Sequence, residues 1–349
     1  MLAVQLQTGG ELRTIPGDEI AQMKRDLSIS DVASLSADLK ARIRENLGSD
    51  LIIVGWYSAQ GESPQTQIRL NLELQEAEGG DASTTVEGSG TEENLPSLVS
   101  SVANQVLEKL KLRTISETDS KRAGAILPSS PAAARLYSEA LDKLRNYVLV
   151  AARDLLQQVI VQERDNPTAH SALAEAWQAL GYDSRALEEA KAALDVSASL
   201  PPEQRALVTA RYAEIGSNGK EAIDTYRSLV RIFSDNVDYG LRLAQTQIEA
   251  GNGKEALTTL ATLRKLPPPS GKDPRIDLVA AQAAISLSDF KQAVELTDHC
   301  IATASARGSR LLTARAHLEQ CTAYRRLGDA TKAKAPAKAR KWPSPMWAI

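Results

Sequence analysis

Apolar and polar residues alternate between Thr66 and Gln75, a pattern that predicts a β-strand with one buried and one solvated face. The apolar face consists of Ile68, Leu70, Leu72 and Leu74. Residues 51–59 form a compact apolar run rich in β-branched side chains, which is typical of a buried strand. Residues 82–87 predict a weaker third strand. Together the three segments predict a meander.

Turn-forming residues separate the predicted strands. The segments Gly61–Pro64 and Gly79–Asp81 both carry the glycine that marks a change of chain direction. Nearer the start of the sequence, Met1–Leu6 has the character of the end of a helix, and Glu11–Ile15 predicts a short strand.

Two predicted helices bracket the meander. The first spans about residues 35–47, with Ser34 or Ser36 as its amino-terminal cap and Gly48 ending it. The second spans about residues 92–110 and has apolar residues at helical spacing. These are Leu95, Leu98, Val99, Val102, Val106 and Leu110.

After a polar stretch that ends at Pro131, alanine, leucine and glycine recur with a period of about 34 residues, a length typical of a repeated helix pair. The unit that begins at Pro167 shows the full pattern of repeat positions. They are His170, Leu173, Ala174, Trp177, Gly181, Ala186, Ala190, Ala193 and Leu194. Pro201-Pro202 inserts two residues and Pro267–Pro269 inserts three, yet the pattern resumes after each insertion. Small residues at these positions allow two helices to approach closely.

On these residues, the region 131–335 resembles the tetratricopeptide repeat family. The resemblance implies stacked helix pairs whose first helices line a concave groove for a peptide or a partner helix. Lys143 stands where the family usually has an aromatic residue, so we expect the first repeat to act as a cap. Pro336 falls inside the expected last helix, which we expect to end at Ala335. Residues 336–349 are predicted to be a disordered tail.

Residues 1–115 resemble the small α/β domain of FlgO-type, curli-assembly-type and TolB amino-terminal-type bacterial proteins. Besides the closing helix, the residues that carry the resemblance are Leu39–Gly48, Asp50–Trp56 and Gln67–Gln75. The resemblance implies another strand ahead of Met1. We therefore expect a truncated domain whose incomplete sheet allows self-association.

The predicted fold is α+β with two domains. A small α/β domain with an antiparallel-rich sheet and helices covers residues 1–115, a linker covers residues 116–130, and an all-α tetratricopeptide superhelix follows. The pair of domains resembles the non-catalytic carboxy-terminal region of large bacterial proteins, often Ser/Thr kinases or winged-helix regulators.

Composition and charge narrow the classes of function. The 349 residues are 43% hydrophobic and 24% charged, which is ordinary for a globular protein. Two cysteines exclude a disulfide framework and a four-thiolate zinc site, and no apolar run has the length of a membrane span. The net charge of −3 gives no general attraction to nucleic acid. Residues 1–115 are acidic, with net charge −7, whereas the segment from Thr331 onward carries +5.

The sequence has no complete catalytic motif. Gly216–Lys220 lacks the first glycine and the preceding strand of a phosphate loop, and Gly88–Gly90 lacks the third glycine of a dinucleotide motif, so both are predicted to be turns. Kinase signatures are absent. His299, Cys300, His317 and Cys321 are the few residues of metal-ligating type near one another in the sequence, but Cys300, Cys321, His170 and His317 occupy repeat positions that pack helix against helix. We therefore expect no enzyme activity, cofactor or metal.

The candidate binding residues occupy positions 2, 5, 9 and 12 of the first helix in four repeats, and Arg211 is the strongest single anchor. A guanidinium surrounded by amides and aliphatic groups suits a peptide carboxylate or carbonyl. The alternative interpretation is that these side chains are solvated or contact the next helix. The full set is Thr168, Ser171, Glu175, Gln178, Gln204, Leu207, Arg211, Glu214, Asp238, Leu241, Gln245, Ile248, Arg275, Leu278, Gln282 and Ile285.

Three hypotheses of function follow. The first is a non-catalytic scaffold that binds a protein or peptide in the groove, as a regulatory or sensor region of a bacterial signalling protein. The second is a cell-envelope-associated binding protein that acts through its amino-terminal domain, and the third is a fragment of a Ser/Thr kinase without its kinase domain. The sequence alone indicates a soluble cytoplasmic chain, with a periplasmic location as the alternative in a longer, membrane-anchored parent.

Overall fold

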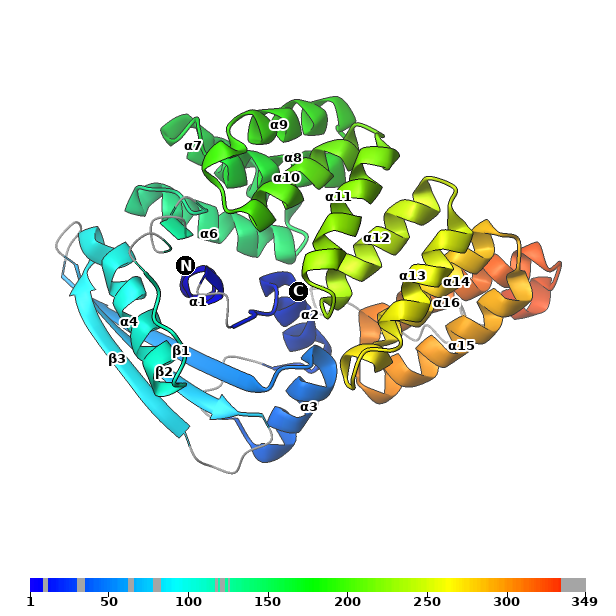
Figure 1. Cartoon of the computed structure of the whole chain (residues 1–349), viewed down its shortest axis with the longest axis horizontal. Coiled ribbons are helices and arrows are strands. Elements are labelled where there is room, and N and C mark those ends of the chain that lie inside the picture. The colour runs from blue at the N-terminus through cyan, green and yellow to red at the C-terminus, as the bar shows by residue number, and fades with distance from the viewer. Residues whose placement is uncertain are drawn as a thin grey trace, which may run out of the picture. The chain divides into compact units, whose positions relative to one another are not determined.

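The computed structural model is mostly helical, with one small sheet in its amino-terminal part (Figure 1). The residues that it describes are 1–8, 12–29, 35–61, 66–77, 83–116, 119, 123–124 and 126–333. The chain divides into two compact units. The first consists of residues 1–25 and 29–218, and the second of residues 26–28 and 219–349.

The sheet has the predicted meander of three antiparallel strands. Strand β1 (Leu51–Gln60) pairs with β2 (Gln67–Glu76), which pairs in turn with β3 (Ser83–Thr91). The β1–β2 register runs without a bulge from Leu51 opposite Glu76 to Gln60 opposite Gln67. On β2, Leu72 and Leu74 are buried, which confirms the predicted apolar face.

Strand β1 differs from its prediction as a buried strand. It lies at one edge of the sheet, and residues 55–60 are all exposed. The exposed fractions of Trp56 and Tyr57 are 48% and 72%. An apolar β-branched run fits an edge as well as a centre, because local composition does not encode the order of strands in a sheet.

The helix predicted after the meander covers one face of the sheet. A short 3₁₀ turn (Glu92–Asn94) leads into α4 (Leu95–Lys109), whose buried side chains follow the predicted helical spacing. Together with α1 (Leu2–Thr8), it encloses the core of this part of the chain. The fully buried members of this core include Leu72, Val86, Val102, Ala103, Val106 and Leu107.

Strand β3 is longer than the predicted segment 82–87 and absorbs a predicted turn. Gly88, Ser89 and Gly90 lie within the strand, opposite Leu70, Arg69 and Ile68 of β2. A Cβ atom at Gly88 would overlap the side chain of Val102. The glycines therefore permit close approach of α4 to the strand, and the prediction of a turn was wrong.

Two helices precede α3 (Ala37–Leu47) in the first part of the chain. Helix α1 agrees with the predicted helical character of Met1–Leu6. The short strand predicted for Glu11–Ile15 is wrong, because residues 12–16 form no strand and are followed by α2 (Gly17–Asp26), which was not predicted. Helix α2 is nevertheless amphipathic, with Met23 buried, so its helical periodicity is a signal that the sequence analysis overlooked.

The ends of α3 follow the predicted signals. The Ser36 hydroxyl accepts a hydrogen bond from the Leu39 backbone N–H at 3.2 Å, and Gly48 adopts a left-handed φ of 67° after the last turn. The alternative cap, Ser34, lies outside the described residues. Two strand-connecting turns were predicted, at Gly61–Pro64 and Gly79–Asp81. Apart from Gly61, they also lie outside the described residues.

Helix pairs at the predicted spacing make up the rest of the described chain. In the first unit they are α6 (Pro131–Arg145) with α7 (Leu149–Gln162), α8 (Pro167–Ala179) with α9 (Asp183–Asp195), and then α10 (Pro202–Ile215). In the second unit they are α11 (Gly219–Ile232), α12 (Val237–Glu249), α13 (Gly253–Leu263), α14 (Pro274–Ser286), α15 (Phe290–Ala306) and α16 (Arg310–Arg326). The motif Gly216–Lys220 lies where α10 ends and α11 begins, as predicted.

The repeat pattern has a clear physical basis at the turns and contacts. The turn inside each helix pair contains one residue with positive φ, namely Tyr147, Gly181, Ser217, Gly251, Ser288 or Gly328. The alanines that the repeat period places between paired helices, such as Ala186 and Ala256, are fully buried. Tetratricopeptide-like helical repeats are therefore confirmed as the fold of this region.

Only part of the predicted linker and none of the predicted tail lie among the described residues. The last two residues of the linker 116–130 are fixed, since the Ser129 and Ser130 backbone N–H groups donate to the Glu163 carboxylate at 2.9 and 2.8 Å. The boundary itself stays a prediction. The predicted disordered tail, residues 336–349, lies outside the described residues, as does Pro336.

Candidate functional site

The predicted binding residues belong to the first helix of each pair, and we call the surface they form the first-helix face. In the first unit this face belongs to α8 and α10, and in the second unit to α12 and α14. Three of their polar members, Arg211, Arg275 and Gln282, pair with side chains of a neighbouring first helix. Each unit shows such pairing independently.

Arg211 on α10 is the centre of the face in the first unit. Its Nη1 atom lies 2.6 Å from Glu175 Oε2 and 3.0 Å from the backbone oxygen of Ser171, both on α8. The expectation of a guanidinium among amides and aliphatic groups is therefore wrong, because a carboxylate is its partner. The pair is partly exposed, so its net contribution to stability is about 0–1 kcal/mol.

Tyr137 on α6 is a buried core residue at the equivalent position of the first repeat, which the sequence analysis did not single out. It precedes Ser171 by one repeat period, so extending the same register to the first repeat would have found it. Burial raises the pKa of its hydroxyl, although a hydrogen bond with Thr168 and the charge of Arg211 act against that rise. The Thr168 hydroxyl also donates to the backbone oxygen of Ile126 at 2.7 Å.

The second unit repeats the arrangement with different residues. Arg275 on α14 places Nη1 2.8 Å from Asp238 Oδ1 on α12, and its Nη2 lies 2.7 Å from Asp273 Oδ2. Further along the same face, the Gln282 side chain donates to Glu319 of α16 at 2.9 Å. The interpretation that these residues contact the next helix therefore holds for the paired positions.

The remaining predicted positions differ in their accessibility. Leu241 and Leu278 are core residues with exposed fractions of 6% and 3%, so they pack helices together and are not open to a partner. Glu175 and Gln178 are exposed. The other members are half-buried: Gln204, Leu207, Glu214, Gln245, Ile248 and Ile285.

Contacts also connect the amino-terminal helices with the repeats of the first unit. Arg25 of α2 donates from Nη1 to the Asn146 side-chain oxygen at 3.0 Å, just after α6 ends. The Gln7 amide of α1 reaches Glu203 of α10 at 3.5 Å. Neither region's own residue pattern predicts these contacts, because they join segments far apart in sequence.

The histidines and cysteines do not form a reactive site among the described residues. His170 donates to Glu189 and to the Arg164 backbone oxygen, and the side chain of His299 contacts Asp277, which also pairs with Arg264. Burial, with nearby aspartates, raises the pKa of Cys300 to about 12, so its thiol stays protonated at neutral pH. No cluster of three metal-ligating side chains occurs in the described part of the chain.

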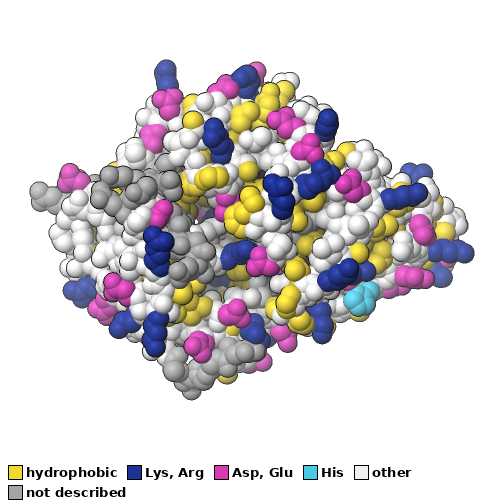
Figure 2. Space-filling view, in the orientation of Figure 1, with side chains coloured by type: hydrophobic (Ala, Val, Ile, Leu, Met, Phe, Trp, Pro, Cys, Tyr) yellow, Lys and Arg dark blue, Asp and Glu magenta, His cyan; other side chains and the backbone are white. Residues whose placement is uncertain are grey.

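Surface charge is mixed on the face that Figure 2 shows. Basic and acidic side chains of the described residues are interspersed there and do not gather into one large patch of a single sign. Helices long and apolar enough to cross a membrane are absent from the described residues.

No protein-family model matches the chain, and no curated protein matches it. Solved structures that resemble it include a tetratricopeptide repeat protein from Parabacteroides merdae, 16% identical over 60% of this chain and 78% of that chain, with a TM-score of 0.40. The type IV pilus biogenesis factor PilW is 15% identical over 60% of this chain and 91% of that chain, with a TM-score of 0.45. A signal transduction ATPase with a tetratricopeptide repeat sensor from Pyrococcus horikoshii is 14% identical over 71% of this chain and 40% of that chain, also with a TM-score of 0.45. Similarities of this size carry no information about function.

Proposed function

We propose that this protein is a non-catalytic scaffold that binds a protein or peptide partner on the first-helix face of its repeats. The observation that carries the proposal is the set of partly exposed polar side chains on the first helices of both units, such as Glu175 and Gln178 on α8 and Gln245 on α12. Stacked helix pairs present such side chains as extended recognition surfaces. A role as a regulatory or sensor region of a bacterial signalling protein is supported by the sequence resemblance alone.

The ion pairs on the face restrict the chemistry of the partner. Because Glu175 and Asp238 already neutralise Arg211 and Arg275, a strongly acidic peptide gains little from either guanidinium. The amides of Gln178 and Gln245 can both donate and accept hydrogen bonds. We therefore expect the backbone or neutral polar groups of the partner to hydrogen-bond with these amides. Charged groups of the partner should contribute little to affinity.

Affinity capture with the whole chain tests the proposal. The double variant Gln178→Arg/Gln245→Arg adds one bulky charge to the first-helix face of each unit. The matched control, Gln158→Arg/Gln292→Arg, adds the same charges at exposed positions on the second helices α7 and α15. We expect a specific partner to be lost with the first variant and retained with the control. Equal capture by both variants would refute the proposal.

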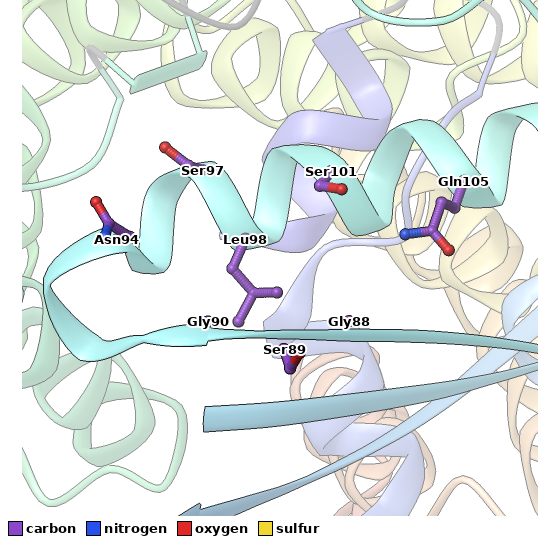
Figure 3. Close-up of a pocket in the computed structure, with 8 residues that line it drawn as sticks. All are labelled: Gly88, Ser89, Gly90, Asn94, Ser97, Leu98, Ser101 and Gln105. Atoms are coloured by element: carbon purple, nitrogen blue, oxygen red, sulfur yellow. The ribbon is translucent and has the colours of Figure 1, made fainter. Parts of the chain in front are cut away.

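A second candidate function is binding by the amino-terminal α/β part, with the repeats serving only to hold it. The observation in its favour is a shallow open groove of about 360 Å³ between β3 and α4 (Figure 3). In the same experiment this candidate predicts that both double variants keep the partner.

A further inference from the structure

A shallow groove runs between strand β3 and one flank of α4. Its floor is formed by Gly88, Ser89 and Gly90, and Leu98 points from the helix toward the strand there (Figure 3). Ser97, Ser101 and Gln105 recur along α4 on the flank that borders the groove, and Asn94 precedes them at the end of the 3₁₀ turn. All eight residues that line it are uncharged.

The two glycines account for the close approach of α4 to the strand that forms the floor of the groove. On the side of β3 that faces the helix, Gly88 and Gly90 have no side chain, so α4 approaches the strand through Val102 and Leu98. A side chain at Gly88 would overlap Val102 and push the helix away from the strand, whereas a Cβ atom at Gly90 would lie at a contact distance of 3.4 Å from Leu98. Glycine within a strand often marks a place where another backbone comes close.

Strand β3 is also an edge strand. It pairs with β2 from Ser83 to Thr91, and no other described strand pairs with it. The edge lacks the usual protection against strand addition, since β3 has no proline and no lysine, and Glu87 is its one charged residue. An extended edge beside a helix offers backbone hydrogen bonds and side-chain contacts to the same ligand.

We propose that β3 and α4 form a docking groove for an extended peptide, which adds to the sheet beside β3. The edge fixes the ligand as a strand, because only an extended backbone matches the spacing of its N–H and C=O groups. The small, neutral lining favours alternate side chains that are themselves small and uncharged, such as serine, threonine, alanine or valine. A charged side chain would lose hydration there without meeting an opposite charge. This groove is separate from the first-helix face and functions whether or not the repeats bind.

The test begins with the whole chain as bait for a displayed library of random peptides of about six residues, a typical strand length. The selected peptide is then synthesised and N-methylated on alternate residues in two frames. In an added strand only every second backbone N–H donates to its neighbour. We expect one frame to weaken binding about tenfold or more and the other to leave it nearly unchanged.

A pair of variants locates the site. Ser101→Arg places a long charged side chain at the groove, whereas Ser100→Arg places the same side chain one residue away on a different side of α4. We expect the first variant to lose the peptide at least about tenfold and the second to bind as the unmodified chain does. Thermal unfolding of both variants shows whether the fold is retained.

Several outcomes would overturn the proposal. Equal effects of the two N-methylation frames would mean that no strand is added. If no peptide is enriched, the groove has no peptide ligand. If Ser101→Arg binds the peptide unchanged, or if the peptide protects the first-helix face from hydrogen exchange, the ligand binds elsewhere. If the chain forms dimers that Ser101→Arg dissociates while no peptide binds, then a second copy occupies this edge.

Discussion

Single alanines determine how closely the paired helices approach. Ala256 on α13 is fully buried against the helices of its repeat, so replacing it with leucine inserts three carbon atoms into a filled space. We expect Ala256→Leu to lower the free energy of unfolding by about 1–3 kcal/mol. Thermal or urea unfolding measures the loss. The control is Ala261→Leu on the exposed side of the same helix, which should change stability little, and equal effects of the two changes would contradict the repeat register.

His170 makes the stability of the first unit depend on pH. Its Nδ1 lies 2.6 Å from the Glu189 carboxylate and its Nε2 lies 2.8 Å from the Arg164 backbone oxygen, so only the doubly protonated ring donates to both acceptors. Burial lowers the pKa of His170, but these two hydrogen bonds outweigh it and the net pKa is raised above 6.5. The stabilisation is therefore complete below about pH 6.5 and is lost as pH rises through the raised pKa.

Unfolding midpoints between about pH 5.5 and 8.5 check this dependence. In Glu189→Gln the carboxylate that favours the protonated ring is gone, so we expect the decrease in stability with rising pH to be smaller than in the unmodified chain. An identical pH profile for the two proteins would show that His170 does not titrate against Glu189.

The structural role of a residue was predictable where it depends on a single repeat. It was not predictable where it depends on the contact between two repeats. The buried alanines and the turn glycines Gly181 and Gly251 follow from the repeat period. The partner of Arg211 does not, because the distance to Glu175 depends on how one helix pair is rotated against the next. Tyr147 shows another limit: it adopts a φ of 58° at a position where other repeats have glycine or serine.

At the scale of elements, the packing of α4 on β3 depends on one glycine more than the other. A methyl group at Gly88 would overlap Val102 and come within 2.9 Å of Leu98 Cδ1, whereas one at Gly90 would lie 3.4 Å from the nearest atom of Leu98. We expect Gly88→Ala to destabilise the protein by about 1–3 kcal/mol and Gly90→Ala to be neutral or slightly stabilising. Urea unfolding of the two variants compares them directly, and the reverse order would contradict the packing described.

Helices and strands were predicted correctly where the apolar periodicity was strong. The prediction failed where one residue type occurs in two kinds of structure. The alternation on β2 and the helical spacing on α4 specify those elements without tertiary information. Gly88 and Gly90 have the composition of a turn, yet here glycine serves close packing inside a strand. The apolar run of β1 indicates a strand but not its place at an edge, since strand order depends on contacts distant in sequence.

At the scale of the whole molecule, the sequence predicts both an α/β part and a long array of helix pairs. Repetition makes this possible, because each helix pair buries its apolar face only against its neighbours and each repeat therefore needs the same pattern. The division into compact units between Asn218 and Gly219 has no such signal, and neither has the contact of Arg25 with Asn146. Both depend on surfaces whose residues do not recur with the period.

If the repeats are the binding part of the molecule, their first helices contact the partner. Hydrogen exchange of the full chain, alone and saturated with the protein it captures most strongly, tests this directly. We expect the partner to slow exchange in α8, α10, α12 or α14 and to leave the second helices α9 and α13 unchanged. Slowed exchange confined to the second helices or to the amino-terminal α/β part, with the first helices unaffected, would contradict binding by the first-helix face.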